Sequence, residues 1–63
     1  MEKFKEHDVV VLIHDLDENL KEGTKGTIIY VYDYDYNFFE VEFNVDSKVF
    51  LRELTYIDLK KVE

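Results

Sequence analysis

The sequence predicts an all-β fold, a small SH3-like barrel of four to five antiparallel strands with a single 3₁₀ turn near the C-terminus. Short runs rich in β-branched and aromatic residues recur along the chain, and polar or glycine-containing turns separate them. Closing such a sheet into a barrel removes the edges that an open sheet of this size would expose. With 63 residues, no proline and no repeat, residues 1–63 are expected to form one domain.

The first strand is expected over residues 8–14, DVVVLIH. Because this run is apolar at almost every position, we expect it to be buried on both faces. The polar segment 15–26 follows and contains the only two glycines, Gly23 and Gly26. Glycine adopts positive φ at little cost, so this segment predicts a loop that ends in a tight turn rather than a short helix.

The remaining strands are expected over residues 27–35, 38–44, 48–54 and 59–62. Phe39, Val41 and Phe43 alternate with Glu40 and Glu42. This period of two indicates a half-buried antiparallel strand whose glutamates face outward. A single 3₁₀ turn is expected over residues 54–58, before the last strand.

An apolar core must supply the stability of this domain. The chain has no cysteine for a disulfide, and its two histidines are too few for a structural zinc site. Hydrophobic residues make up 46% of the chain, which is enough for a packed core. The residues expected in the core are Val10, Leu12, Leu16, Ile29, Val31, Phe39, Val41, Phe43, Leu51, Leu54 and Leu59.

The charge balance limits the partners. The chain carries 15 acidic and 8 basic residues, a net charge of -7, which disfavours direct binding to nucleic acid or to an anionic membrane. An acidic protein attracts basic partners and associates with them faster. Since no apolar run matches a signal peptide or a membrane span, we expect a cytoplasmic protein.

Three motifs follow one another with a characteristic spacing: DVVVL at residues 8–12, the turn from Gly23 to Thr27, and EVEF at residues 40–43. Their order resembles the small bacterial domain-of-unknown-function family numbered 4926. The resemblance runs from about Phe4 to Val62. It implies an SH3-like barrel, related in outline to that of the nitrile hydratase β subunit, in small stand-alone proteins that have no established activity.

The same resemblance bears on function, because some family members neighbour toxin-like genes. The chain departs from the family pattern after the third strand. There, residues 45–48 and 50–52 replace a glycine-containing turn and a strand of small residues. The resemblance therefore implies the fold, but no shared binding surface on the last strands.

No motif in the chain indicates catalysis. Ser47 is the only serine, and no sequence signature accompanies it as a nucleophile. The adjacent His–Asp pairs at residues 7–8 and 14–15 would point to opposite faces of a strand, so they cannot easily hold one metal ion. The Gly23–Gly26 turn lacks the Lys-Ser/Thr of a phosphate loop. We expect no enzyme, no metal and no cofactor.

The most informative local pattern is a ladder of tyrosines at alternate positions between residues 30 and 36. If Val31 points into the core, the tyrosines point outward, next to the outward glutamates of the following strand. Tyrosines bordered by carboxylates are typical of protein-binding surfaces, although outward tyrosines can also simply cover a thin barrel. The candidate partner-binding residues are Tyr30, Tyr32, Tyr34, Tyr36, Asp33, Asp35, Glu40 and Glu42.

These observations predict a non-catalytic protein-binding module, foremost a small acidic inhibitor or immunity-type, antitoxin-like protein that masks a basic partner such as a nuclease toxin. The alternative is an SH3-like accessory or scaffold module, KOW-like in its Gly23–Gly26 turn, for which Lys21 and Lys25 would matter most. A third possibility is a homodimer whose interface is the tyrosine surface.

Overall fold

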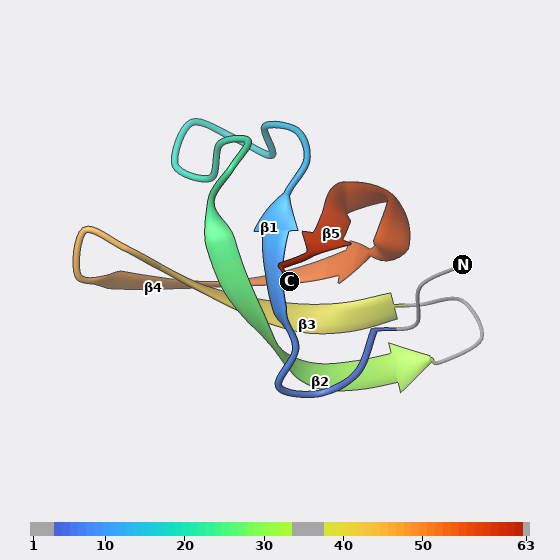
Figure 1. Cartoon of the computed structure of the whole chain (residues 1–63). Coiled ribbons are helices and arrows are strands. Elements are labelled where there is room, and N and C mark those ends of the chain that lie inside the picture. The colour runs from blue at the N-terminus through green and yellow to red at the C-terminus, as the bar shows by residue number, and fades with distance from the viewer. Residues whose placement is uncertain (1–3, 34–37, 63) are drawn as a thin grey trace.

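The structure is a computed structural model that describes residues 4–33 and 38–62. Its elements are β1 (Val9–Leu12), β2 (Lys25–Asp33), β3 (Phe38–Val45), β4 (Lys48–Thr55), the 3₁₀ turn Tyr56–Asp58 and β5 (Leu59–Lys61). All strand pairings are antiparallel. The expected all-β fold, with five antiparallel strands and one 3₁₀ turn near the C-terminus, is confirmed. The segment between β1 and β2 is a loop, as expected (Figure 1).

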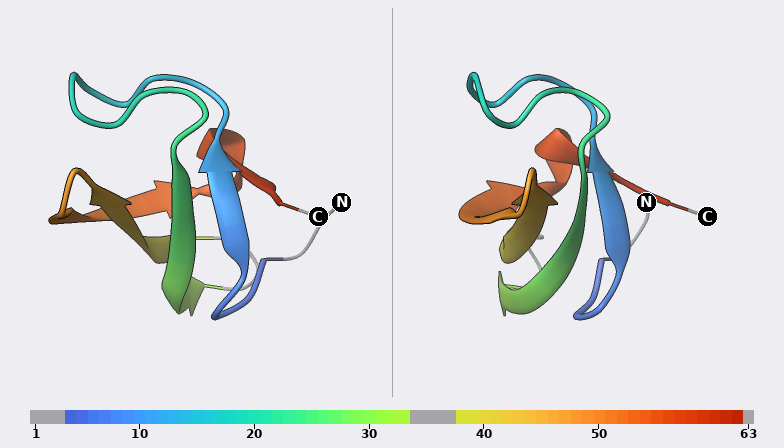
Figure 2. Two further views of the ribbon diagram at one scale, coloured as in Figure 1. Left: turned by 60° about the vertical axis from the view of Figure 1, so that its left-hand side comes forward. Right: turned by 90° about the vertical axis from the view of Figure 1, so that its left-hand side faces the viewer.

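The strands form one sheet in the order β4-β3-β2-β1-β5. The long strand β2 pairs with β1 through residues 25–27 and with β3 through residues 26–33. Figures 1 and 2 show that the sheet bends sharply, so that the β3–β4 hairpin crosses the direction of β1. Over the described residues no pairing joins β4 to β5. The sheet is therefore open over the described residues, where the sequence predicted a closed SH3-like barrel, and its curvature encloses the core.

Two irregularities in β2 decide which side chains reach the core. The β2–β3 register shifts between Ile28 and Tyr30, and again between Val31 and Asp33. Such bulges add a residue to one strand and increase its twist. Ile28 and Val31 are buried as a result, whereas Ile29 is 38% exposed. The prediction of Ile29 in the core was wrong, because a strict period of two does not survive a bulge.

One cluster of buried residues forms the core: Phe4, Val10, Leu12, Leu20, Ile28, Val31, Phe39, Val41, Phe43, Leu54 and Leu59. Leu16 is only partly buried against it. Leu51, which was predicted in the core, is 47% exposed. The pairing of Leu54 with buried Phe39 sets the inward positions of β4, and Leu51, three residues earlier, falls on the opposite face.

The first strand is buried on one face only, contrary to the expectation from its apolar sequence. Val10 and Leu12 are buried, whereas Val9 is 46% and Ile13 44% exposed. β1 lies between β2 and β5 in a single sheet, and within residues 4–33 and 38–62 no second layer covers its outer face (Figure 2). An apolar run therefore does not by itself require burial on both faces.

The two glycines have different structural roles. Gly23 has a φ of +91°, which is the conformation expected for a glycine turn. Gly26 does not have a positive φ; it pairs with Phe43 across β2 and β3. A Cβ at Gly26 would lie 2.7 Å from the Phe43 ring and 2.9 Å from the Glu42 carbonyl oxygen. Gly26 thus allows close packing of β2 against β3.

Candidate functional site

Tyr30 and Tyr32 lie on the outer face of β2, as predicted, with exposed fractions of 51% and 45%. Their rings contact each other edge to face, with centroids 4.9 Å apart. The Tyr32 ring also lies 5.3 Å from the ring of Phe38 at the start of β3. The bulge before Tyr30 and the inward position of Val31 direct both tyrosines away from the core. They form a small aromatic surface that remains open to solvent.

Glu40 joins this aromatic surface from β3. It pairs with Tyr30 in the β2–β3 register, and its Oε1 accepts a hydrogen bond of 3.2 Å from the Tyr32 hydroxyl. The pKa of Tyr32 is raised, first by desolvation, then by its hydrogen bond to Glu40 and the negative charges of Glu40 and Glu53, and last by hydrogen bonding with the Glu53 side chain. Tyr32 therefore remains a neutral donor beside carboxylates at physiological pH.

Glu53 on β4 lies directly opposite Glu40. The β3–β4 turn consists of Asp46 and Ser47, both with positive φ, and Val45 pairs with Lys48. In a two-residue hairpin of this kind the closing pair is hydrogen-bonded and the following pairs alternate. Counting from the turn, Glu40 and Glu53 form a non-hydrogen-bonded pair.

The side chains of non-hydrogen-bonded pairs approach closely, with Cα atoms about 4.5 Å apart. Like charges in this position destabilise a sheet. The ion pairs described among residues 4–33 and 38–62 use other carboxylates, and none of them includes Glu40, Glu42 or Glu53. We refer to Tyr30, Tyr32, Glu40 and Glu53 as the tyrosine–glutamate face.

The other predicted site residues have different positions. Glu42 is partly buried and lies on the same face of β3 as Glu40, between Thr27 and Leu51 of the neighbouring strands. Asp33, also partly buried, pairs with Phe38. The remaining predictions, Tyr34, Asp35 and Tyr36, lie outside the described residues.

The sequence-based prediction missed Glu53 and Phe38. The alternation in KVFLREL places Val49, Leu51 and Glu53 on one face and Phe50, Arg52 and Leu54 on the other. That pattern could have identified Glu53 as an outward residue. A core that includes both Leu51 and Leu54 conflicts with this pattern, because residues three positions apart face opposite sides of a regular strand.

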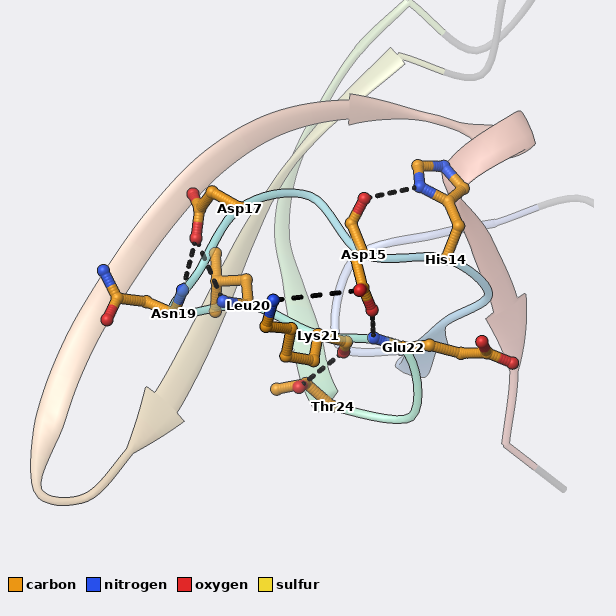
Figure 3. Close-up of polar contacts among 8 residues, drawn as sticks. All are labelled: His14, Asp15, Asp17, Asn19, Leu20, Lys21, Glu22 and Thr24. Atoms are coloured by element: carbon orange, nitrogen blue, oxygen red, sulfur yellow. Dashed lines mark hydrogen bonds and ion pairs between the residues drawn. The ribbon is translucent and has the colours of Figure 1, made fainter.

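A second group of carboxylates lies in the β1–β2 loop, residues 13–24. Figure 3 shows Asp17 Oδ1 accepting hydrogen bonds from the backbone N–H groups of Asn19, at 2.8 Å, and Leu20, at 3.0 Å. Asp15 accepts the Glu22 N–H at 2.8 Å and lies 3.8 Å from Lys21 Nζ. These carboxylates hold the loop in a fixed shape over buried Leu20.

Two contacts join this loop to the rest of the sheet. Arg52 Nη2 on β4 lies 3.3 Å from Asp17 Oδ2, and His14 Nε2 lies 2.8 Å from Asp58 Oδ1 in the 3₁₀ turn. The pKa of Asp17 is lowered, chiefly by the hydrogen bond from the Asn19 backbone N–H. The Leu20 backbone N–H and the Arg52 guanidinium lower it further. The pKa of His14 is raised by its hydrogen bonds to the Asp15 carbonyl and to Asp58.

Other kinds of site are absent from the described part of the chain. Within residues 4–33 and 38–62, no three histidine or acidic side chains are grouped to hold a metal ion, and no pocket is present. In the same ranges, no helix is long and apolar enough to span a membrane. The tyrosine–glutamate face is therefore a surface feature.

Comparison with known proteins supports the resemblance to a family. The model of the domain of unknown function DUF4926 matches residues 6–48. This segment includes β1, β2 and β3 with the tyrosines and Glu40, whereas Glu53 lies beyond it. No curated protein and no solved structure matches the chain significantly. With most of its length matched by the family model, the chain belongs to the DUF4926 family.

Proposed function

We propose that this protein is a non-catalytic binding domain that holds a basic protein partner on its tyrosine–glutamate face. In its more specific form, the proposal is an inhibitor or immunity-type protein that masks the basic surface of a toxin or nuclease. The observation that carries it is the cross-strand pair Glu40 and Glu53 beside Tyr32, whose hydroxyl bonds Glu40. An arginine or lysine from a partner would relieve the repulsion between these two glutamates.

The chemistry of the face suits an arginine in particular. Two carboxylates accept the forked hydrogen bonds of a guanidinium, and charge-assisted bonds of this kind are stronger than neutral ones. Tyrosine rings add contact area and attract a cation over their faces. The edge-to-face contact between Tyr30 and Tyr32 orders these rings before a partner binds, which reduces the entropy cost of association.

The net charge of -7 supports the same proposal at longer range. A strongly acidic protein steers basic partners toward itself, and this effect weakens as salt screens the charges. Carboxylates can occupy the positions that phosphates take on a nuclease surface. An acidic inhibitor would therefore compete directly with a nucleic-acid substrate, with a fast association rate that depends on ionic strength.

Capture of partners from a native lysate tests the proposal with a charge-matched control. The test variant is Glu40→Lys with Glu53→Lys, and the control is Glu18→Lys with Glu22→Lys in the β1–β2 loop. Both double variants change the net charge equally. We expect the wild type and the control to retain a basic protein that the test variant loses, and we expect high salt to release it.

Loss of the partner in both double variants would mean that net charge alone matters and would contradict the proposal. Retention in both would also contradict it. If changes at Lys21 and Lys25 abolished capture while changes at the face did not, the accessory-module alternative would replace it. Lys21 already lies 3.8 Å from Asp15 within the loop, and this contact favours a structural role for it.

A further inference from the structure

The outer edge of β4 is a second feature of this side of the molecule. β3 and β4 pair in one regular register from Val45↔Lys48 to Phe38↔Thr55, without a bulge. The Val45–Lys48 pair that closes the turn is hydrogen-bonded, and hydrogen-bonded and non-hydrogen-bonded pairs alternate from there. The backbone groups of Phe50, Arg52 and Leu54 therefore bond to β3. Val49, Leu51 and Glu53 occupy the positions between them. The N–H and C=O groups of these three residues therefore point away from β3.

β4 is an edge strand, so nothing in the sheet pairs with these groups. The Leu51 carbonyl accepts a hydrogen bond of 3.0 Å from Arg52 Nη1. Within residues 4–33 and 38–62, no other described hydrogen bond reaches the backbone of Val49, Leu51 or Glu53. The edge thus presents backbone donors and acceptors, and among them only the Leu51 carbonyl has a described side-chain partner, Arg52.

The side chains of Val49, Leu51 and Glu53 are also exposed to solvent. Val49 is 58% and Leu51 47% exposed, and Glu53 is exposed beside them. Proteins commonly protect an edge with proline, a bulge, a very short strand, charged side chains or a covering loop. β4 is eight residues long and regularly paired, without proline or a bulge, and its protection consists of charged side chains such as Arg52, which also contacts Asp17 of the β1–β2 loop. An edge of this kind can accept an added strand.

We infer that this edge binds an extended, basic segment of the partner as an additional antiparallel strand, an inference that rests on the proposed function. The added strand would place an arginine or lysine opposite Glu53 and apolar side chains opposite Leu51 and Val49. The basic residue is required because Glu53 already faces Glu40 on its other side. The antiparallel direction matches every pairing of the sheet and is the more stable one.

A second copy of the chain fits the edge less well. An antiparallel pairing of two β4 strands centred on Leu51 would place Glu53 of each copy opposite Val49 of the other. No positive charge would reach the Glu40–Glu53 pair, and two chains of net charge -7 would repel each other. The edge and the tyrosine–glutamate face share Glu53, so one basic segment can contact both.

The test uses the full chain and the blocked peptide Lys-Thr-Arg-Thr-Val-Thr-Ile-Thr, in which Arg, Val and Ile are placed to oppose Glu53, Leu51 and Val49. Amide hydrogen exchange is followed by NMR at low salt. In the free protein, the amides of Val49, Leu51 and Glu53 should exchange fast and those of Phe50, Arg52 and Leu54 slowly. The peptide should slow the exchange of the first three.

Two N-methylated peptides provide the matched comparison. Methylating the Ile nitrogen removes a bond to the Val49 carbonyl and should weaken binding about tenfold. Methylating the nitrogen of the Thr before it, which faces away from β4, should leave affinity nearly unchanged. Val49→Lys should also abolish binding, whereas Val62→Lys, at an exposed position outside β4, should not.

Several outcomes would overturn the edge proposal. If the peptide shifts the Tyr32 and Glu40 resonances but leaves the β4 amides unprotected, the face binds basic segments without strand addition, and the proposed function stands. Equal affinity of the two methylated peptides, or no binding of any peptide, also overturns it. The proposal is also overturned if, in the free protein, protection of the β4 amides increases with protein concentration. A second copy of the chain would then occupy the edge. The proposed function itself fails only in the capture experiment.

Discussion

The β1–β2 loop and the tyrosine–glutamate face both carry carboxylates, but their surroundings differ. In the loop, Asp17 accepts two backbone N–H bonds and meets Arg52, and Asp15 accepts the Glu22 N–H. On the tyrosine–glutamate face, Glu40 accepts a hydrogen bond from the Tyr32 hydroxyl but lies opposite a second glutamate, Glu53. The carboxylates of the loop have donors and cations within the chain, whereas the face places two glutamates opposite each other across β3 and β4, an arrangement that disfavours strand pairing.

This difference distinguishes carboxylates that stabilise the fold from carboxylates that are candidates for binding a partner. The sequence alone does not make this distinction. A carboxylate with backbone donors and a cation nearby is already satisfied and gains little from a partner. A pair of closely opposed carboxylates gains from any cation that reaches it. Natural binding surfaces often sacrifice stability in this way. Four measurements of stability test the comparison, from the largest expected effect to the smallest.

Leu20→Ala should give the largest loss of stability. Leu20 is fully buried and anchors the loop to the core, so its truncation should cost about 2–5 kcal/mol in the free energy of unfolding. Urea unfolding followed by circular dichroism measures this loss. The control Ile57→Ala, at a position 63% exposed, should change stability by less than about 0.5 kcal/mol. Equal losses would mean that the loop is not anchored through Leu20.

Asp17→Ala should destabilise the protein less than Leu20→Ala but more than the charge-matched Glu18→Ala. The folded-state pKa of Asp17 is lowered, so its stabilisation is present above the unfolded pKa, near 3.9. It is lost as the pH falls through the lower folded value. Unfolding curves at neutral and strongly acidic pH should therefore show a difference between variant and wild type that shrinks in acid. A constant difference would contradict the role of the charge.

Glu53→Gln should have the opposite sign. Removing one charge from the pair with Glu40 should raise the free energy of unfolding by about 0.2–1 kcal/mol, while weakening capture of a basic partner. Glu18→Gln in the loop removes the same charge and serves as the control. A loss of stability in Glu53→Gln would show that Glu53 already has a stabilising cation within this chain.

His14→Gln should have the smallest effect, and one that depends on pH. Because the folded-state pKa of His14 is raised, its contribution is fully present below the unfolded pKa, near 6.5, and is lost as the pH rises through the folded value. Thermal unfolding at pH 5.5 and pH 8.5 should show a larger cost of the substitution at the lower pH. Asp58→Asn should weaken this pH dependence, since Asp58 is the side-chain partner of His14.

Much of the fold could be predicted because the relevant signals are local. The alternation from Phe39 to Phe43 correctly predicts the inward and outward sides of β3, and Gly23 marks a turn with positive φ. The outward direction of Tyr30 and Tyr32 also follows from the inward position of Val31. The burial of Ile28 in place of Ile29 does not follow, because a bulge depends on the neighbouring strand.

The sequence by itself determines that this chain is all-β, strongly acidic and rich in tyrosine, because composition and a period of two depend only on the residues themselves and their neighbours. The opposition of Glu40 and Glu53, residues from different strands, follows only from the β3–β4 register. The Arg52–Asp17 contact, across 35 positions, likewise requires the folded sheet. Which carboxylates have partners within the chain and which lie opposite another carboxylate is thus decided by tertiary structure, since it depends on which strands and loops the fold brings together.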